Sequence, residues 1–252
     1  ESGDRLLVCA KTSNAIQYVY SDNYGSSWTS AASISGTSSS HQNPGLSMRP
    51  ATPATSVLVY DDGSAIYFRN RYTSSWSSAV NVSSGSGTID NCYPSVEMDG
   101  NYVRNIAWQG FSLPLQTQVI VHRRGTGSFS IFDLNSTLYN PSITGHDNDK
   151  RSIVFYKTYN SIYRTHYNGS SWSLSFIASQ GKNPNISTGS ATAKYVWTDI
   201  SDSPYEIKLS NEQLPSGGLL KIADATAENP VENLIHHRSV ILQDSVSSTL
   251  LW

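Results

Sequence analysis

The chain has 252 residues, of which 14% are charged and 38% hydrophobic, and its formal net charge at pH 7 is −2. This balance gives no electrostatic reason to expect a nucleic-acid partner, and no stretch reaches the roughly 18 apolar residues of a membrane-spanning helix. Fifteen Tyr and six Trp argue against disorder and indicate a substantial core. A single all-β domain of this length is common.

Short β-prone runs alternate with turns rich in Asn, Asp, Gly and Ser, the pattern of antiparallel hairpins. The first complete hairpin joins a strand predicted at 16–20 to a run that opens at Trp28, through the octet 21–28. Reduced copies of this turn recur at 72–76, 125–129 and 167–172. No segment carries a sustained 3.6-residue apolar period, so helix is a minor component.

A second repeating signal is an Xaa-Pro dipeptide, found at spacings of 50, 47, 43 and 46 residues. Proline lacks the N–H that a central strand ladder requires, so each dipeptide is predicted to begin the first strand of a repeat. The five copies are Asn43-Pro44, Tyr93-Pro94, Asn140-Pro141, Asn183-Pro184 and Asn229-Pro230.

Each repeat continues with three more predicted strands. The second strand ends in an aromatic residue, at 56–60, 105–108, 152–156 and 194–197, with 5–10 as its N-terminal copy. The third occupies 16–20, 66–71, 119–123, 162–167 and 207–209, and the fourth opens at Trp28, Trp76, Phe129, Trp172 and near Leu219. Four antiparallel strands in about 47 residues, repeated, predict the blades of a β-propeller.

The predicted fold class is therefore all-β, a β-propeller of four-stranded antiparallel blades. The N-terminal repeat lacks its first strand, and a strand at 229–235 could supply it, so that five blades close into a ring over residues 1–236. Closure hides sheet edges that would otherwise pair with other chains. Residues 237–252 then form a C-terminal tail, which is an extra hairpin, part of a sixth blade or the start of a following domain.

The octet 21–28 resembles the Asp-box of bacterial-neuraminidase-type repeats, Ser-x-Asp-x-Gly-x-Thr-Trp. Ser21, Gly25 and Trp28 match this pattern, whereas Asn23 stands in the Asp position and Ser27 in the Thr position. The resemblance implies a sialidase-like propeller of the kind found in secreted bacterial proteins. In that family the Asp-box is a structural hairpin turn, which implies turn capping by residue 23 and packing of the tryptophan between sheets.

Sialidase chemistry needs three arginines around a carboxylate, a Tyr–Glu nucleophile and an Asp acid, and bidentate carboxylate binding is the reason for arginine. Arg49, Arg104 and Arg123 lie in three different repeats, and Glu97 is a candidate nucleophile partner. Nothing in the spacing selects these residues. Sialidase activity itself is therefore not expected.

The aromatic residue that ends each second strand is the strongest candidate for ligand contact. Equivalent positions of successive blades would surround the axis, and flat aromatic faces flanked by polar groups suit sugar rings. The candidate ligand-binding residues are Tyr60, Asp61, Trp108, Gln109, Tyr156, Lys157 and Trp197. The alternative is that these aromatics pack between blades, each burying roughly 150–250 Å². Trp28, Trp76 and Trp172 are predicted core residues.

Catalytic alternatives depend on carboxylates that follow the second strands. Asp61, Asp62 and Asp199 could provide acid–base groups at the axial face, although Asp62-Gly63 is also an ordinary hairpin turn. The six histidines show no metal-site spacing, and no phosphate loop or Ser/His/Asp set stands out, so no metal or cofactor is predicted. Cys9 and Cys92 could be buried free thiols or a disulfide.

These observations predict an extracellular, sialidase-like propeller module that binds carbohydrate or protein without catalysis. The expected partner is a glycan or an extracellular protein, and the module would be secreted or displayed on a cell surface within a larger multidomain protein. Two alternatives stay open. One is a carbohydrate-active enzyme, a glycoside hydrolase or polysaccharide lyase, with its site at the axial face. The other is a purely structural spacer or adhesion domain.

Overall fold

The computed structural model describes residues 6–23, 25–49, 55–72, 75–99, 101–145, 149–188, 193–201, 206–211, 220–224, 240–243 and 248–251. Within these ranges the regular structure is all β, and no helix is long and apolar enough to cross a membrane. The chain divides into two compact units, one of Glu1–Met98 and Tyr102–Phe132, the other of Asp99–Asn101 and Asp133–Trp252.

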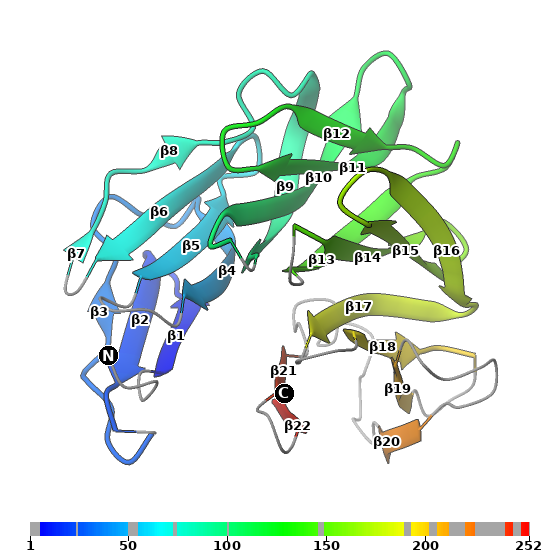
Figure 1. Ribbon diagram of the computed structural model, residues 1–252. Coiled ribbons are helices and arrows are strands. Elements are labelled where there is room, and N and C mark those ends of the chain that lie inside the picture. Colours follow the sequence, from blue (N-terminus) through cyan, green and yellow to red (C-terminus); the bar gives the residue numbers. More distant parts are fainter. Residues whose placement is uncertain are drawn as a thin grey trace. The chain divides into compact units, whose positions relative to one another are not determined.

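The first unit contains three antiparallel sheets (Figure 1). The first sheet has the strand order β1 (Leu6–Lys11), β2 (Ile16–Ser21) and β3 (Ala32–Ser33). The second consists of β4 (Gln42–Arg49), β5 (Thr55–Asp61), β6 (Ile66–Tyr72) and β7 (Ser75–Trp76), with β8 (Val80–Asn81) also paired to β6. The third consists of β9 (Thr88–Met98), β10 (Arg104–Ser112), β11 (Thr117–Arg124) and β12 (Phe129–Phe132). Among the described residues the first sheet has no counterpart of β4 or β9, as the sequence predicted for the N-terminal repeat.

The second unit contains two four-stranded antiparallel sheets and a hairpin. One sheet is β13 (Leu138–Gly145), β14 (Arg151–Lys157), β15 (Ser161–Tyr167) and β16 (Trp172–Ala178). The next is β17 (Gly181–Thr188), β18 (Ala193–Asp199), β19 (Glu206–Asn211) and β20 (Leu220–Asp224). In the C-terminal tail, β21 (Val240–Gln243) pairs with β22 (Ser248–Leu251), and β21 lies beside β17. The predicted closing strand at 229–235 lies outside the described residues.

The four Xaa-Pro dipeptides that the structure describes lie inside the first strands, not at their starts. β4 begins at Gln42 and β9 at Thr88, both before the proline of the strand. The pairing register shifts at each dipeptide. The residue before the proline has a left-handed backbone in Asn43 (φ 48°), Tyr93 (φ 52°), Asn140 (φ 45°) and Asn183 (φ 48°). A β-bulge leaves one residue out of the ladder, which is how an interior position tolerates a missing N–H. The dipeptides therefore mark the first strands as predicted, but the prediction that they begin these strands was wrong.

The apolar runs of the second strands are buried on both faces. In β5, Val57 and Val59 belong to a core shared with Ile106 and Trp108 of the third sheet. The side chains that alternate with them, Leu58 and Tyr60, join a core shared with the first sheet. Successive side chains of a strand point to opposite faces, so a strand sandwiched between two sheets reads as a continuous apolar run. The cores therefore lie between consecutive sheets.

Candidate functional site

Three of the predicted ligand-contacting aromatics are enclosed in these cores. Tyr60, Trp108 and Trp197 are 0%, 0% and 2% exposed. The Trp108 Nε1–H donates to Asn91 Oδ1 at 2.9 Å, and Arg69 Nε donates to the Tyr60 hydroxyl at 3.0 Å. The sequence left open whether these aromatics contact a ligand or pack between blades. Their burial shows that these three rings pack between blades.

The fourth predicted aromatic, Tyr156, is one residue away from the position equivalent to the other three. In every complete repeat, the residue after the bulge proline pairs with the residue before the buried aromatic, and the pairs are Gly45–Val59, Ser95–Ala107, Ser142–Val154 and Asn185–Val196. The equivalent of Trp108 is therefore Phe155, which is fully buried. A shift of one residue moves a side chain to the other face of the sheet.

Tyr156 and Lys157 consequently occupy a different environment from the buried rings, and both are half-buried. The Tyr156 ring stacks on Tyr139 of the paired strand, with ring centroids 5.0 Å apart and an interplanar angle of 22°. Lys157 Nζ lies 5.4 Å from the ring centroid of Tyr163. We call Tyr139, Tyr156 and Lys157 the tyrosine-pair site. It combines two flat faces, two hydroxyl groups and a cation at the end of β14.

Asp61 and Gln109, the polar neighbours of the buried rings, are also enclosed. The Asp61 carboxylate is 1% exposed. Its Oδ2 accepts from Asn43 Nδ2 at 2.8 Å and from the Tyr93 N–H at 3.1 Å, and its Oδ1 accepts from the Gly63 N–H at 3.1 Å. Gln109 is 5% exposed and donates to Gln118 at 3.3 Å. Asp61 thus ties together the bulges of two consecutive sheets.

Asp62 belongs to the tight turn between β5 and β6. Its Oδ1 accepts from the Ser64 N–H at 3.0 Å and the Ala65 N–H at 2.8 Å, and Gly63 is left-handed with φ 85°. Burial acts to raise the pKa of Asp62, but the hydrogen bonds from Ala65, Ser64 and Tyr67 outweigh it and hold the pKa below its ordinary value. Asp62-Gly63 is therefore an ordinary hairpin turn in the structure.

Two of the three arginines nominated for a sialidase-type site, Arg104 and Arg123, each cover an aromatic ring. The Arg104 guanidinium lies 3.9 Å from the Phe68 centroid, and that of Arg123 lies 4.7 Å from the Phe129 centroid. Arg123 also donates to the Val82 carbonyl at 3.0 Å. The side chain of Arg49 lies outside the described residues. No shared anion pocket follows from these contacts.

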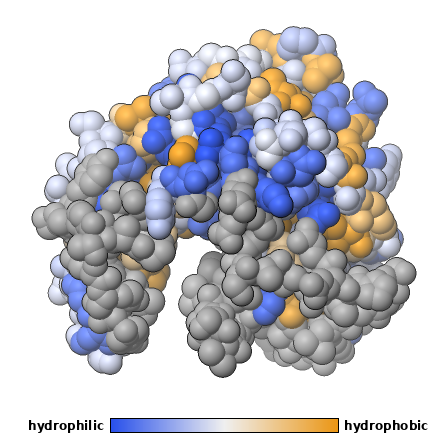
Figure 2. All heavy atoms as spheres, viewed as in Figure 1, coloured by the Kyte–Doolittle hydropathy of each residue, from blue (hydrophilic) through white to orange (hydrophobic). Residues whose placement is uncertain are grey.

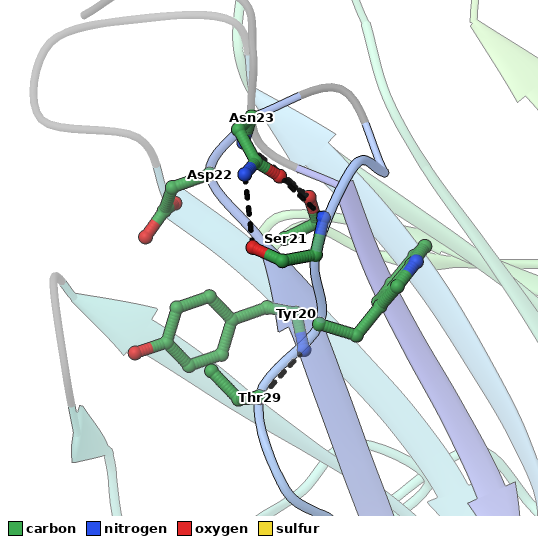
Figure 3. Close-up of a pocket in the computed structure, with 7 residues that line it drawn as sticks. Tyr20, Ser21, Asp22, Asn23 and Thr29 are labelled. Carbon is green, nitrogen blue, oxygen red and sulfur yellow. Dashed lines mark hydrogen bonds between the residues drawn. The ribbon is translucent and has the colours of Figure 1, made fainter.

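The octet folds as a hydrogen-bonded turn (Figure 3). Ser21 is 1% exposed, and its Oγ donates to Asn23 Oδ1 at 2.8 Å and accepts from the Gly25 N–H at 2.8 Å. Asn23 Oδ1 also accepts from the Ser27 N–H at 2.9 Å, and Asn23 Nδ2 donates to Ser27 Oγ at 2.9 Å. With Gly25 at φ 84°, these contacts give residue 23 the turn-capping role that the resemblance implied.

Trp28 corrects the expectation of a core residue, because 44% of its surface is exposed. Its counterparts Trp76 and Trp172 are half-buried and lie in β7 and β16, which pair with β6 and β15. After the first octet the chain re-enters the sheet only at β3, so Trp28 has no place in a ladder. It instead lines a pocket of about 260 Å³ with Tyr20, Ser21, Asp22, Asn23, Ser27 and Thr29 (Figure 3).

Cys9 and Cys92 are both free, which decides between the two possibilities left open by the sequence. Across the described ranges, no group of three His, Cys, Asp or Glu side chains could hold a metal ion.

The sequence matches no protein-family model and no curated protein. Among solved structures, the fucose-specific lectin from Aleuria aurantia has a TM-score of 0.61 at 12% identity, over 87% of this chain and 73% of that one. A protein from Dyadobacter fermentans DSM 18053, described as of unknown function, has a TM-score of 0.62 at 10% identity, over 88% and 80%.

A further structure of the Aleuria aurantia lectin, described as a six-bladed β-propeller, has a TM-score of 0.59 at 15% identity, over 87% of this chain and 73% of that one. Likeness at this identity concerns the fold, and the Asp-box remains a resemblance carried by the octet. The chain has an all-β fold, a β-propeller of five antiparallel blades that are four-stranded where complete.

Proposed function

We propose that this chain is an extracellular carbohydrate-binding propeller module, part of a longer protein and without catalytic activity of its own. The observation that carries the proposal is the stacked, half-buried Tyr139–Tyr156 pair beside Lys157. The similar lectin from Aleuria aurantia is described as fucose-specific, so a propeller of this general shape can serve sugar recognition. The scarcity of charge, at 14% of residues, fits a surface that contacts neutral hydroxyl groups.

The tyrosine-pair site has the features of a sugar contact. Aromatic faces pack against the C–H face of a sugar ring, while hydroxyl, ammonium and amide groups bond its hydroxyls. Tyr156 also packs against the core of the second unit, so its ring is held in place before a ligand arrives. Beside it, Asn140 Nδ2 donates to Asn183 Oδ1 at 3.0 Å, which adds fixed amides at the same end of the sheets.

A glycan array tests the function, and titration of the best ligand tests the site. Tyr139→Ala and Tyr156→Ala should each weaken binding about 5- to 30-fold, because stacking of a sugar ring on an aromatic face is worth on the order of 1–2 kcal/mol. Tyr102→Asn is the matched control, since Tyr102 is a 45% exposed tyrosine of the other unit. Wild-type protein that binds no glycan, or unchanged affinity in both alanine variants, would overturn the proposal.

One observation favours a second candidate, a carbohydrate-active enzyme. Glu97 of β9 is half-buried, and burial raises the pKa of its carboxyl to about 7 despite hydrogen bonds from Ser47 Oγ and the Met98 N–H, both at 2.9 Å. A carboxyl of such pKa suits general acid catalysis at neutral pH. Release of reducing sugar or unsaturated product from a polysaccharide panel, lost in Glu97→Gln, would establish this function. Inactivity on the whole panel would exclude it.

A further inference from the structure

The pocket at the first octet lies apart in sequence from the tyrosine-pair site and belongs to the other unit. Its seven lining residues run from Tyr20 to Thr29 along a single hairpin (Figure 3). A volume of about 260 Å³ lies just under the roughly 300–1,000 Å³ of pockets for drug-sized ligands. It therefore suits one small ring, not an extended chain.

Trp28 differs from its counterparts in having no aromatic or cationic partner among the described residues. The Trp76 ring meets Tyr18 edge-on, with centroids 5.7 Å apart. The Trp172 ring lies 5.2 Å from the ring of Tyr167 and 5.4 Å from the Arg151 guanidinium. Trp28 makes no such contact and remains 44% exposed. A large aromatic that the fold does not cover, set in a concave site, marks a contact surface.

The walls around Trp28 are fixed by hydrogen bonds. Thr29 Oγ1 accepts from the Tyr20 N–H at 3.1 Å, and the Thr29 N–H donates to the Tyr20 carbonyl at 3.0 Å. The Arg71 guanidinium, on a residue only 3% exposed, lies 4.7 Å from the Tyr20 ring centroid and holds that ring. The bonds within the octet fix the other side. A site built in advance loses little entropy when a ligand binds.

Asp22 is the charged residue among the seven that line the pocket. Its side chain is exposed and extends in Figure 3 to the same side of the strand as the Tyr20 ring. A carboxylate accepts hydrogen bonds from sugar hydroxyls and repels a uronate, sialate or sulfate group.

We propose that the hairpin 20–29 is a second saccharide site, which stacks one neutral sugar ring on Trp28 and bonds its hydroxyls through Asp22. The inference rests on the carbohydrate-binding function proposed above, but it needs neither Tyr139 nor Tyr156. It assigns the octet of the first blade a ligand-binding role beyond its structural one.

The test uses the indole N–H signals of the six tryptophans in a two-dimensional NMR spectrum. The signal lost in Trp28→Phe identifies Trp28. Methyl glycosides of fucose, galactose, mannose and glucose are titrated, with methyl glucuronide as the acidic probe. We expect a neutral glycoside to shift the Trp28 signal to saturation, and the glucuronide to bind at least about tenfold more weakly. Asp22→Asn should weaken binding of the neutral glycoside and reduce the difference in affinity between it and the glucuronide.

The experiment has four informative outcomes. A Trp28 shift that persists in Tyr139→Ala supports the inference whether or not the tyrosine pair binds sugar. A Trp28 signal that stays still while the array shows binding lost in Tyr139→Ala overturns the inference and leaves the proposed function standing. Tighter binding of the glucuronide than of every neutral glycoside overturns the assigned role of Asp22. Absence of binding to all probes and to the array overturns both sites.

Discussion

Ser142 and Asn185 stand 43 residues apart and bond each other, with Ser142 Oγ donating to Asn185 Oδ1 at 2.8 Å. Both residues directly follow a bulge proline, in β13 and β17. The residues directly before those prolines, Asn140 and Asn183, form a second bond across the same 43-residue interval. The interval equals the spacing of the dipeptides, so equivalent positions of neighbouring blades meet. Polar side chains here join the first strands of two blades.

A double-mutant cycle measures this link. Ser142→Ala and Asn185→Ala should each lower the free energy of unfolding by about 1 kcal/mol, the net value of a typical hydrogen bond. The double variant should show a coupling of about 0.5–1.5 kcal/mol, because each single change already breaks the shared bond. Urea denaturation supplies the values, and Ser170→Ala, at an exposed turn serine, should have almost no effect. Purely additive losses would mean that the bond contributes nothing.

The two tryptophans Trp108 and Trp28 should differ in their effect on stability. Trp108→Ala removes a fully buried ring and its bond to Asn91, and we expect a loss of about 3–5 kcal/mol. Trp28→Ala should change the free energy of unfolding by no more than about 0.5 kcal/mol, because the ring is 44% exposed. Chemical denaturation of both variants checks this contrast. Equal losses would show that Trp28 is packed in solution.

The architecture could be predicted because its signals are local and repeated. Each of the four described Xaa-Pro dipeptides marks a bulge with a left-handed residue before the proline, and each buried second strand reads as an apolar run. The number of repeats could therefore be predicted from the spacing of the prolines alone. The predicted missing strand of the first blade followed from the same count.

The sequence could not predict in the same way on which face of a sheet an individual side chain lies. In β14 the adjacent aromatics Phe155 and Tyr156 both fit the pattern, and only the pairing of Ser142 with Val154 shows which one is equivalent to Trp108. Trp28 is exposed because the chain leaves the sheet between β2 and β3. That path depends on tertiary contacts, which a turn motif does not encode.

Glu97 should make stability depend on pH. Burial raises the pKa of its carboxyl from 4.5 to about 7, so the folded state holds the proton more tightly than the unfolded state. Relative to Glu97→Gln, the free energy of unfolding should fall as pH rises from about 4.5 to about 7, by up to about 3 kcal/mol at 1.4 kcal/mol per pKa unit. Urea denaturation at several pH values measures the difference. A constant difference across this range would show an ordinary pKa.

Cys9 should be inert toward thiol reagents in the native protein. Burial raises the pKa of its thiol to about 12, although the nearby Arg71 charge acts in the opposite direction. Only the thiolate is nucleophilic, so at pH 8 Cys9 should react with the reagent only when the protein unfolds. The Cys92→Ser variant leaves Cys9 as the single cysteine, and a colorimetric thiol assay follows it with and without denaturant. Full labelling of the native protein within minutes would contradict the prediction.

Within β17, the stability order of glycine and alanine variants should reverse between the left-handed bulge residue Asn183 and the ordinary strand residue Ser187. At Asn183, with φ 48°, alanine loses the bond from Asn140 and is also strained, because a Cβ disfavours left-handed backbone by about 1–2 kcal/mol. Asn183→Gly loses the bond but not the conformation, so it should be the more stable variant. At Ser187, an ordinary position of β17, Ser187→Gly should instead be less stable than Ser187→Ala by about 0.5–1 kcal/mol. Urea denaturation of the four variants decides. If alanine were preferred at both positions, the bulge would not hold residue 183 in a left-handed conformation, and the structural reason for the repeated Asn-Pro dipeptide would fail with it.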